Sequence, residues 1–130
     1  MLIAKSIDEK PGSDDGYRLL LTHAWPPKLP ASGADGFNPE LAPPLESYQA
    51  LKEGKMSYEQ FAAEYEKALE PKAERLRRLN KQAKDFTITL LSYPDVKGHK
   101  IAQVVVDRCR KLGADDSAES KIKALQDPKA

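Results

Sequence analysis

The chain has 130 residues, of which 40% are hydrophobic, and its 21 basic and 20 acidic side chains leave a net charge of +1. This length and composition are typical of one globular domain with a sizeable core, and they exclude a disordered chain. The near-neutral charge excludes a strong overall attraction to nucleic acid or to an anionic membrane.

No run of apolar residues is long enough to cross a bilayer, and residues 1–5 become polar too soon to form the core of a secretion signal. The single cysteine, Cys109, has no partner for an internal disulfide. Both observations predict a soluble protein of the reducing cytoplasm.

The first third of the chain predicts two strands and a long loop. Residues 2–7 form a short apolar run, and residues 17–23 form a nearly continuous one that is typical of a strand covered on both faces. Turn-forming residues fill the interval 11–16. Residues 24–44 are rich in proline and glycine, which indicates a long loop that is either mobile or functional.

Three helices are predicted next, because apolar side chains recur at helical spacing in three segments. Ser57 and Gln60 match the capping box that opens the second helix. Gly54 is expected to end the first helix and Pro71 to begin the third. The three helices are expected over residues 45–53, 58–69 and 72–84.

Residues 86–93 alternate apolar side chains with threonine and predict the third strand. A last amphipathic helix is expected to follow the turn at 95–98 and to end at Gly113. Residues 1–113 are therefore expected to form one domain, and residues 114–130 a polar tail with one short helix or none.

The order of these elements predicts an α/β fold, with a small, mainly parallel sheet of three or more strands flanked by four or five helices. The link between the first two strands is too short for a helical crossover. These two strands are therefore either antiparallel or not adjacent, and the strand order stays open.

A pattern near the N-terminus, Asp15-Gly16-Tyr17-Arg18-Leu19-Leu20 followed by Trp25-Pro26, resembles the opening of a known family. This is the domain-of-unknown-function 488 family, the YeaO-like proteins. Later segments match the family in order, so that the likeness covers residues 1–112. These segments are residues 40–43, 58–69, 87–93 and His99.

The chain departs from the family pattern at three places. Pro27, followed by Lys28, stands where the family has an arginine after tryptophan-proline. Thr22-His23 replaces an aspartate-arginine pair, and Lys100 replaces the asparagine that follows the family histidine. The resemblance implies a divergent member with the family's fold, and it implies no reaction.

Ligands of parallel α/β sheets usually bind beyond the carboxyl ends of the strands. Residues 23–28 and residues 92–99 are expected to meet there, with helix N–H groups available to an anion. From these segments we predict His99 and Asp95 as a catalytic acid–base pair, and His23, Trp25, Lys28 and Tyr93 as ligand contacts.

Each of these residues also has a structural interpretation. Trp25 is more often a packing residue than a stacking platform, and His23, at the end of an apolar strand, more often has a structural role than a catalytic one. Asp95 suits a turn or helix cap. His99, on the opposite side of its helix from the apolar residues, suits a position in solvent.

Other chemistry has little support in the sequence. Histidines and carboxylates lack a metal-ligand spacing, no glycine-rich phosphate loop is present, and no cofactor is predicted. Arg77, Lys81 and Lys84 lie on one face of the basic helix 72–84 and have the spacing to follow phosphates. No aromatic residue lies among them, which argues against nucleic acid.

Two functions are left open. The first is a small-ligand or anion site at the strand ends, with an unassigned reaction. The second is a non-catalytic interaction module that uses the loop 24–44, the basic helix or the tail. A pocket that holds His99 and Trp25 together favours the first, whereas separate faces and an exposed apolar patch elsewhere favour the second.

Overall fold

The computed structural model describes the backbone of residues 1–126 and the side chains of residues 1–118. Its sheet has four strands, all parallel, in the order β1-β4-β2-β3. The strands are β1 (Leu2–Ser6), β2 (Tyr17–Leu20), β3 (Gly36–Phe37) and β4 (Ile88–Ser92). The predicted α/β class and parallel sheet are confirmed, and β1 and β2 are separated by β4 rather than paired.

The central strand β4 is buried along its whole length. Because neighbouring residues of a strand point to opposite faces, Ile88 and Leu90 face the main core, while Thr89 and Leu91 face the other side of the sheet. The strand's two buried polar side chains are hydrogen-bonded, because the Thr89 hydroxyl donates to the carbonyl oxygen of Asp15 and the Ser92 hydroxyl to that of Leu21.

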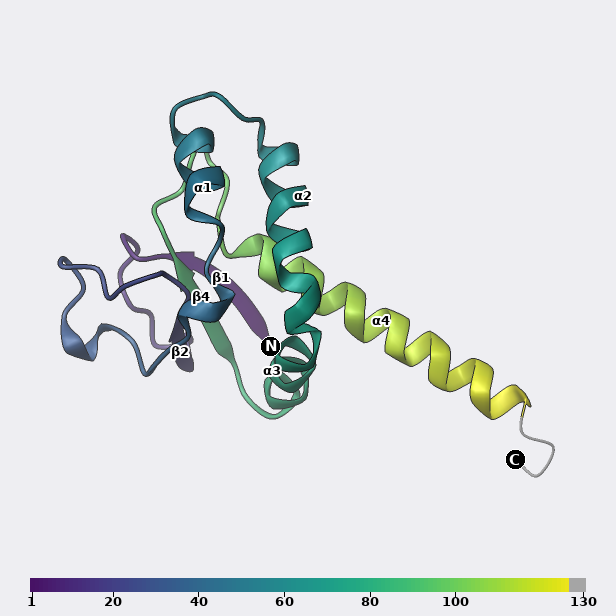
Figure 1. Ribbon diagram of the computed structural model, residues 1–130. Coiled ribbons are helices and arrows are strands. Elements are labelled where there is room, and N and C mark those ends of the chain that lie inside the picture. Colours follow the sequence, from purple (N-terminus) through teal and green to yellow (C-terminus); the bar gives the residue numbers. More distant parts are fainter. Residues whose placement is uncertain (127–130) are drawn as a thin grey trace.

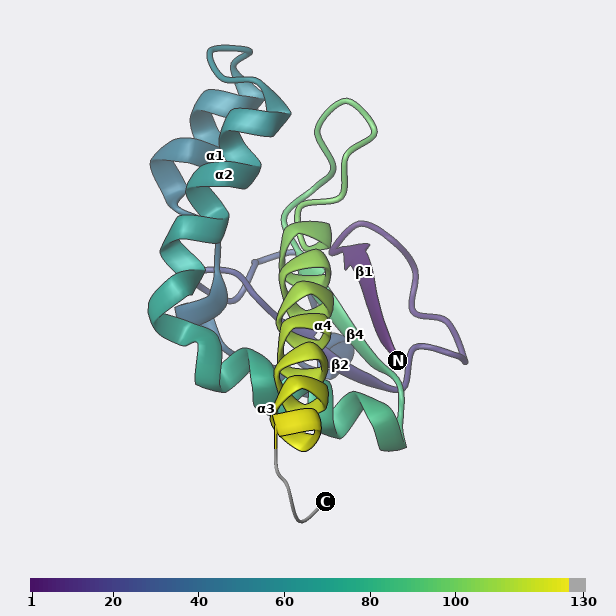
Figure 2. The same ribbon diagram turned by 90° about the vertical axis from the view of Figure 1, so that its right-hand side faces the viewer.

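All four α-helices in the described chain contribute to the core on one face of the sheet. In Figure 2, α4 lies in front of the strands with α1 and α2 beside it. The capping box of Ser57 and Gln60 opens α2 as predicted. The helices are α1 (Leu45–Lys52), α2 (Tyr58–Leu69), α3 (Ala73–Asp85) and α4 (Gln103–Gln126).

The opposite face of the sheet is covered by loops. Arg18 points to this side from β2, and its Nε donates to the carbonyl oxygen of Gly33 at 2.9 Å, within the loop that precedes β3. The hydroxyl of Thr89 donates to the carbonyl oxygen of Asp15 at 2.7 Å. Both faces of the sheet are therefore covered, although helices lie on only one of them.

The prediction that Gly113 ends the last helix is wrong, because α4 continues to Gln126 and projects past the rest of the structure (Figure 1). Glycine lowers helix propensity without forbidding a helix, and here it lies against α3. A Cβ at Gly113 would lie 3.5 Å from Nδ2 of Asn80, which itself donates to the carbonyl oxygen of Cys109. The small residue therefore sits where the two helices pack.

The last helix also begins later than predicted, at Gln103 rather than at His99. Lys97 and Gly98 both have positive φ, and the backbone groups of Val96 and His99 form an antiparallel bridge around them. The turn predicted at residues 95–98 is therefore present, and it extends to His99, which was expected to open the helix. None of the helices in the described part of the chain combines the length and the apolar character that a membrane crossing requires.

Candidate functional site

His23 and Tyr93 meet at the carboxyl edge of the sheet, directly after the neighbouring strands β2 and β4. Nδ1 of His23 lies 2.6 Å from the Tyr93 hydroxyl, and the His23 backbone N–H donates to the same oxygen at 3.0 Å. The two rings are stacked, with centroids 5.9 Å apart. The convergence of these two segments is therefore present as the parallel sheet predicts.

Tyr48 of α1 continues this arrangement into a stack of three rings, which we call the strand-end stack (His23, Tyr93, Tyr48). Its ring centroid lies 4.7 Å from that of Tyr93, and its hydroxyl donates to the carbonyl oxygen of Pro94 at 3.0 Å. Burial raises the pKa of Tyr48 to about 12, and neighbouring Tyr93 and two carboxylates add to the shift. The hydroxyl is therefore a hydrogen-bond donor at neutral pH.

Asp95 lies near this stack, and its partner is Lys100. The Lys100 ammonium lies 3.7 Å from the Asp95 carboxylate and 2.7 Å from that of Glu9, which also accepts the backbone N–H of Ser6. Burial works to raise the pKa of Glu9, but the hydrogen bonds from Lys100 and Ser6 outweigh it, so this pKa is lowered. The hydrogen bond to Glu9 in turn raises the pKa of Lys100.

His99 lies in the turn that its backbone closes with Val96, and its side chain has its own partner. Its imidazole stacks on Tyr58 of α2, with centroids 4.0 Å apart and planes at 6°. Among the described residues, no hydrogen bond or ion pair joins His99 to Asp95. The two residues predicted as an acid–base pair therefore have different partners.

Trp25 and Lys28 lie on the long loop between β2 and β3. The Trp25 indole N–H donates to the carbonyl oxygen of Leu29 at 2.9 Å, and its ring meets Phe37 edge-on at 5.8 Å. Lys28 is exposed. Of the six predicted site residues, the structure thus brings only His23 and Tyr93 into direct contact.

A different concavity lies between α3 and the β2–β3 edge of the sheet, with a volume of about 440 Å³. Tyr17, Phe37 and Phe86 line it, and their exposed fractions are 42%, 41% and 47%. Arg75 and Arg78 of α3 complete the rim. We call these five residues and the space between them the aromatic–arginine cavity.

Three separate elements bring the aromatic rings to this cavity. Tyr17 begins β2, Phe37 ends β3, and Phe86 follows the last turn of α3. Gly36 allows the Tyr17 ring to cross β3, since a Cβ there would lie 2.3 Å from the Tyr17 hydroxyl. The cavity was missed by sequence reasoning, because β3 has two residues inside a predicted loop and gives no strand pattern of its own.

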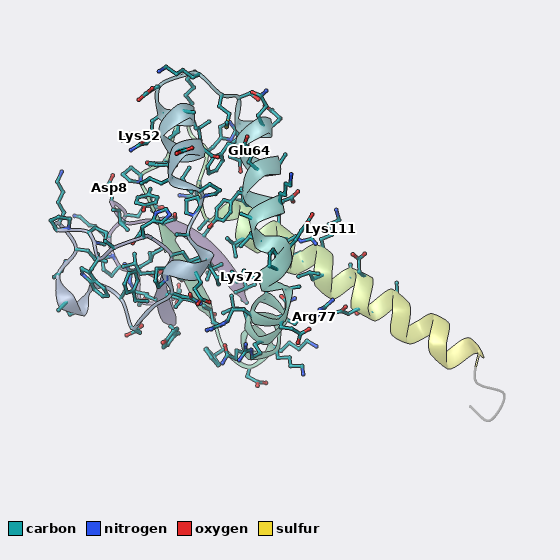
Figure 3. The ribbon with its side chains drawn as sticks, in the orientation of Figure 1. Asp8, Lys52, Glu64, Lys72, Arg77 and Lys111 are labelled. Atoms are coloured by element: carbon teal, nitrogen blue, oxygen red, sulfur yellow. The ribbon has the colours of Figure 1, made fainter. Side chains whose placement is uncertain are left out.

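The cations of α3 fall on two sides of the helix. Arg77 faces α4, where it pairs with Asp116 at 3.0 Å and also with Glu74 at 3.1 Å, and the hydrogen bonds that it donates to these carboxylates raise its pKa, the one to Asp116 most. Figure 3 shows Arg77 on this side and Lys72 on the side away from α4. The face that the sequence suggested for phosphates is thus partly neutralised by acids.

Arg75 and Arg78 lie on the cavity side of α3. Arg75 approaches the Glu40 carboxylate only at 4.0 Å, and Arg78 has no ion pair within the described residues. No acidic side chain lines the cavity. Its rim is therefore cationic.

The comparison with family models gives one match, the inactive DUF488-N3 subclade, over residues 1–124. The chain belongs to this subclade. The resemblance to the domain-of-unknown-function 488 family is therefore confirmed, and the match extends beyond residue 112 into the second half of α4. No curated protein and no solved structure matches the chain.

The motif that opens this DUF488-N3 chain has mainly internal partners. The Asp15 carboxylate accepts from Lys5 at 2.6 Å and from the backbone of Gly12 at 3.1 Å, and it pairs with Arg18. Burial works to raise the pKa of Asp15, but these hydrogen bonds outweigh it and lower the pKa. Tyr17 and Leu19 are the motif residues that line the cavity.

Within the described residues of this DUF488-N3 protein, no three histidine, cysteine or acidic side chains are grouped so that they could hold a metal ion. Cys109 is buried in the core, and burial raises the pKa of its thiol to about 12. A thiol of this kind is protonated at neutral pH and is a poor nucleophile.

Proposed function

We propose that the protein is a non-catalytic binding module whose binding surface is the aromatic–arginine cavity. The observation that carries this proposal is the contrast between two regions. The predicted acid–base residues Asp95 and His99 have different partners, whereas three exposed aromatic rings gather beside two arginines in a lining that contains no carboxylate.

General acid–base catalysis requires groups within hydrogen-bond reach of each other or of a shared substrate atom. Asp95 and Lys100 are engaged with each other, and His99 is stacked flat on Tyr58. The description of the subclade as inactive supports the same conclusion. The strand ends therefore lack the assembled pair that a reaction by these residues would use.

The cavity has the general properties of a ligand site. Its volume of about 440 Å³ falls within the range of small-molecule pockets, roughly 300 to 1,000 Å³. Tyr17, Phe37 and Phe86 are three of the five exposed large hydrophobic residues in the described chain. Apolar side chains that gather at one exposed place commonly mark an interaction site.

The test is a thermal-shift screen of the pure protein against metabolites, nucleotides, simple anions and divalent metals, with mass spectrometry of each compound after incubation. A ligand that binds only the folded state raises the melting temperature. We expect a shift that is lost in Phe86→Ala and retained in His99→Ala, with the compound chemically unchanged. A shift that depends on His99 or Asp95, or a converted compound, would overturn the proposal.

The strand-end stack supports a second candidate, a small-ligand or anion site. His23 is exposed, and its ring nitrogen lies 2.6 Å from the Tyr93 hydroxyl at the carboxyl edge of the sheet. In the same screen, this candidate requires a shift that disappears in His23→Ala and Tyr93→Phe but persists in Phe86→Ala. A shift that depends on Arg75 or Arg78 would argue against this candidate.

A further inference from the structure

We infer that the aromatic–arginine cavity binds a nucleotide unit, with its base against the aromatic rings and its phosphate at Arg75 and Arg78. This inference rests on the proposed function and names its ligand. A nucleotide joins a flat aromatic group to an anion a few ångströms away, and the cavity presents the complementary pair of surfaces.

The aromatic part of the cavity is held in place before any ligand enters. Phe37 is supported by the edge-on contact with Trp25 at 5.8 Å. The Tyr17 hydroxyl donates to the carbonyl oxygen of Asp35 at 3.4 Å, across the open surface of Gly36. Rings fixed in this way lose little conformational freedom when a base stacks on them.

The cationic part is suited to a phosphate. Arg75 and Arg78 are three residues apart, so they lie on the same side of α3 about one turn apart. A guanidinium donates two parallel hydrogen bonds to phosphate oxygens, which a single ammonium cannot do. No carboxylate lines the cavity itself. Outside the lining, the Glu40 carboxylate lies 4.0 Å from Arg75, so Arg78 is the guanidinium of the pair that has no acidic partner among the described residues.

In the sequence, no aromatic residue lies among the cations of the basic helix, which argues against nucleic acid. In the folded chain, Tyr17 and Phe37 come from β-strands distant in sequence, and Phe86 comes from the residue after α3. These three rings stand beside Arg75 and Arg78 in one cavity. Stacking surface and charge are thus combined in space although they are separated in the sequence.

A nucleotide unit can arrive free or as part of a single strand. Arg78 also lines a second cavity, of about 900 Å³, together with Lys81 and Lys84. Lys81 and Lys84 therefore continue the cations of α3 beyond the aromatic rings, in a cavity that Glu74 and Asp116, the partners of Arg77, also line. A strand would place further phosphates on this extension, whereas a free nucleotide would use the aromatic–arginine cavity alone.

The experiment is fluorescence anisotropy with labelled single-stranded RNA and DNA 12-mers, with unlabelled AMP, adenosine and inorganic phosphate as competitors. We expect AMP to compete better than adenosine or phosphate, because it alone engages both halves of the cavity. A free nucleotide as the natural ligand predicts that AMP binds as tightly as the 12-mers. A strand predicts tighter 12-mer binding that weakens with salt, with a slope of roughly 0.7 per phosphate contacted.

Two variants and two matched controls connect the binding to the cavity. Phe86→Ala removes one ring and Arg78→Gln removes one guanidinium, and each is expected to weaken binding about tenfold. Leu45→Ala removes a side chain of equal exposure, 47%, from α1. Lys111→Gln removes one charge from α4, away from the cavity (Figure 3). Both controls are expected to bind like the unmodified protein.

The inference is overturned if neither the 12-mers nor AMP bind, or if they bind and Phe86→Ala and Arg78→Gln leave the affinity unchanged. Circular dichroism melting of each variant checks that it is folded, and Arg78→Lys, which keeps the charge, should recover only part of the affinity. A peptide or other metabolite that depends on Phe86 would leave the proposed function intact and defeat this inference. The absence of any Phe86-dependent ligand would defeat both.

Discussion

Gly16 has a φ of 63° at the entrance to β2, and a Cβ on it would lie 2.2 Å from the carbonyl oxygen of Thr87. A side chain at this position would therefore carry two separate costs. It would require a backbone conformation that L-residues rarely adopt, and it would clash with Thr87, the residue before β4. Gly54, which ends α1, has a similar φ of 75° but no atom within 4 Å of its Cβ position.

We expect Gly16→Ala to lower the free energy of unfolding by about 3 kcal/mol or more, because strain and clash add. Gly54→Ala is the matched control and should cost only the conformational part, about 1–2 kcal/mol. Urea denaturation of both variants measures the difference. Equal losses would show that the close approach to Thr87 costs nothing.

Asp15 is the residue for which pH dependence has a clear sign. Its pKa is lowered in the folded protein, so the ionised carboxylate stabilises the fold at neutral pH. That contribution is present above the carboxyl's usual pKa and is lost as the pH falls through the lowered one. Asp15→Asn should therefore reduce stability at pH 7 and bring the variant closer to the unmodified protein below about pH 4.

Chemical denaturation at pH 7 and at pH 3 measures the two differences. The control is Asp14→Asn, one residue earlier in the chain, whose side chain is exposed. A constant difference between Asp15→Asn and the unmodified protein across this range would show that ionisation of Asp15 does not contribute to the stability of the fold.

Among the elements, α4 gives the clearest case of a local signal overridden by packing. Gly113 looks like a helix stop in the sequence, but it lies inside α4 and has no positive φ. The side chain of Asn80 packs against this position from α3. The helix boundary is therefore decided by the contact between two helices, which the local sequence does not contain.

Gly113→Ala is expected to stabilise the protein by about 0.5–1 kcal/mol, because alanine favours the helix and its Cβ would make an ordinary contact at 3.5 Å. If the helix instead ended at residue 112 with Gly113 as its left-handed cap, the same substitution would destabilise the protein. Thermal unfolding followed by circular dichroism distinguishes the two signs.

The elements that the sequence predicts well are those with a strong pattern of their own. The alternation in residues 86–93 predicts β4, and Ser57 with Gln60 predicts the start of α2. β3 has only Gly36 and Phe37, and it forms because β2 offers an open edge to pair with. A strand that depends on its neighbour in this way has no alternating sequence pattern from which it could be predicted.

The contacts of the candidate site differ in the same way in how far the sequence predicts them. His23 and Tyr93 follow neighbouring parallel strands, so their meeting is predictable from topology alone. The stacking of His99 on Tyr58 depends on the path of a turn, and the aromatic–arginine cavity depends on β3 and on the end of α3. The roles of the six predicted residues, and residues 1–113 as an independent domain, stay predictions.

At the scale of the whole molecule, Cys109 reports on the integrity of the core. It lies at the contact of α3 and α4, where burial raises the pKa of its thiol to about 12. Thiolates react with alkylating agents and protonated thiols do not. Reaction therefore requires an opening that separates α4 from the rest of the protein.

We expect alkylation of the native protein to be far slower than that of the urea-unfolded protein, and to accelerate with urea as steeply as global unfolding does. Quenched labelling followed by mass spectrometry gives the rates. A rate independent of urea at low concentration would reveal a local opening of α4 instead.

The position of β4 between β1 and β2 has a consequence for the order in which the protein is made. β1 pairs with β4, and β2 pairs with β4 at every residue, with only two further pairs to β3. β4 begins at residue 88. On the ribosome, β1 therefore lacks the strand with which it pairs, and β2 lacks all but its two pairs with β3, until residues 88–92 have been synthesised. Contacts this distant in sequence also slow refolding. During that interval the apolar residues of both strands depend on the cell's chaperones, or on rapid translation, to stay out of aggregates.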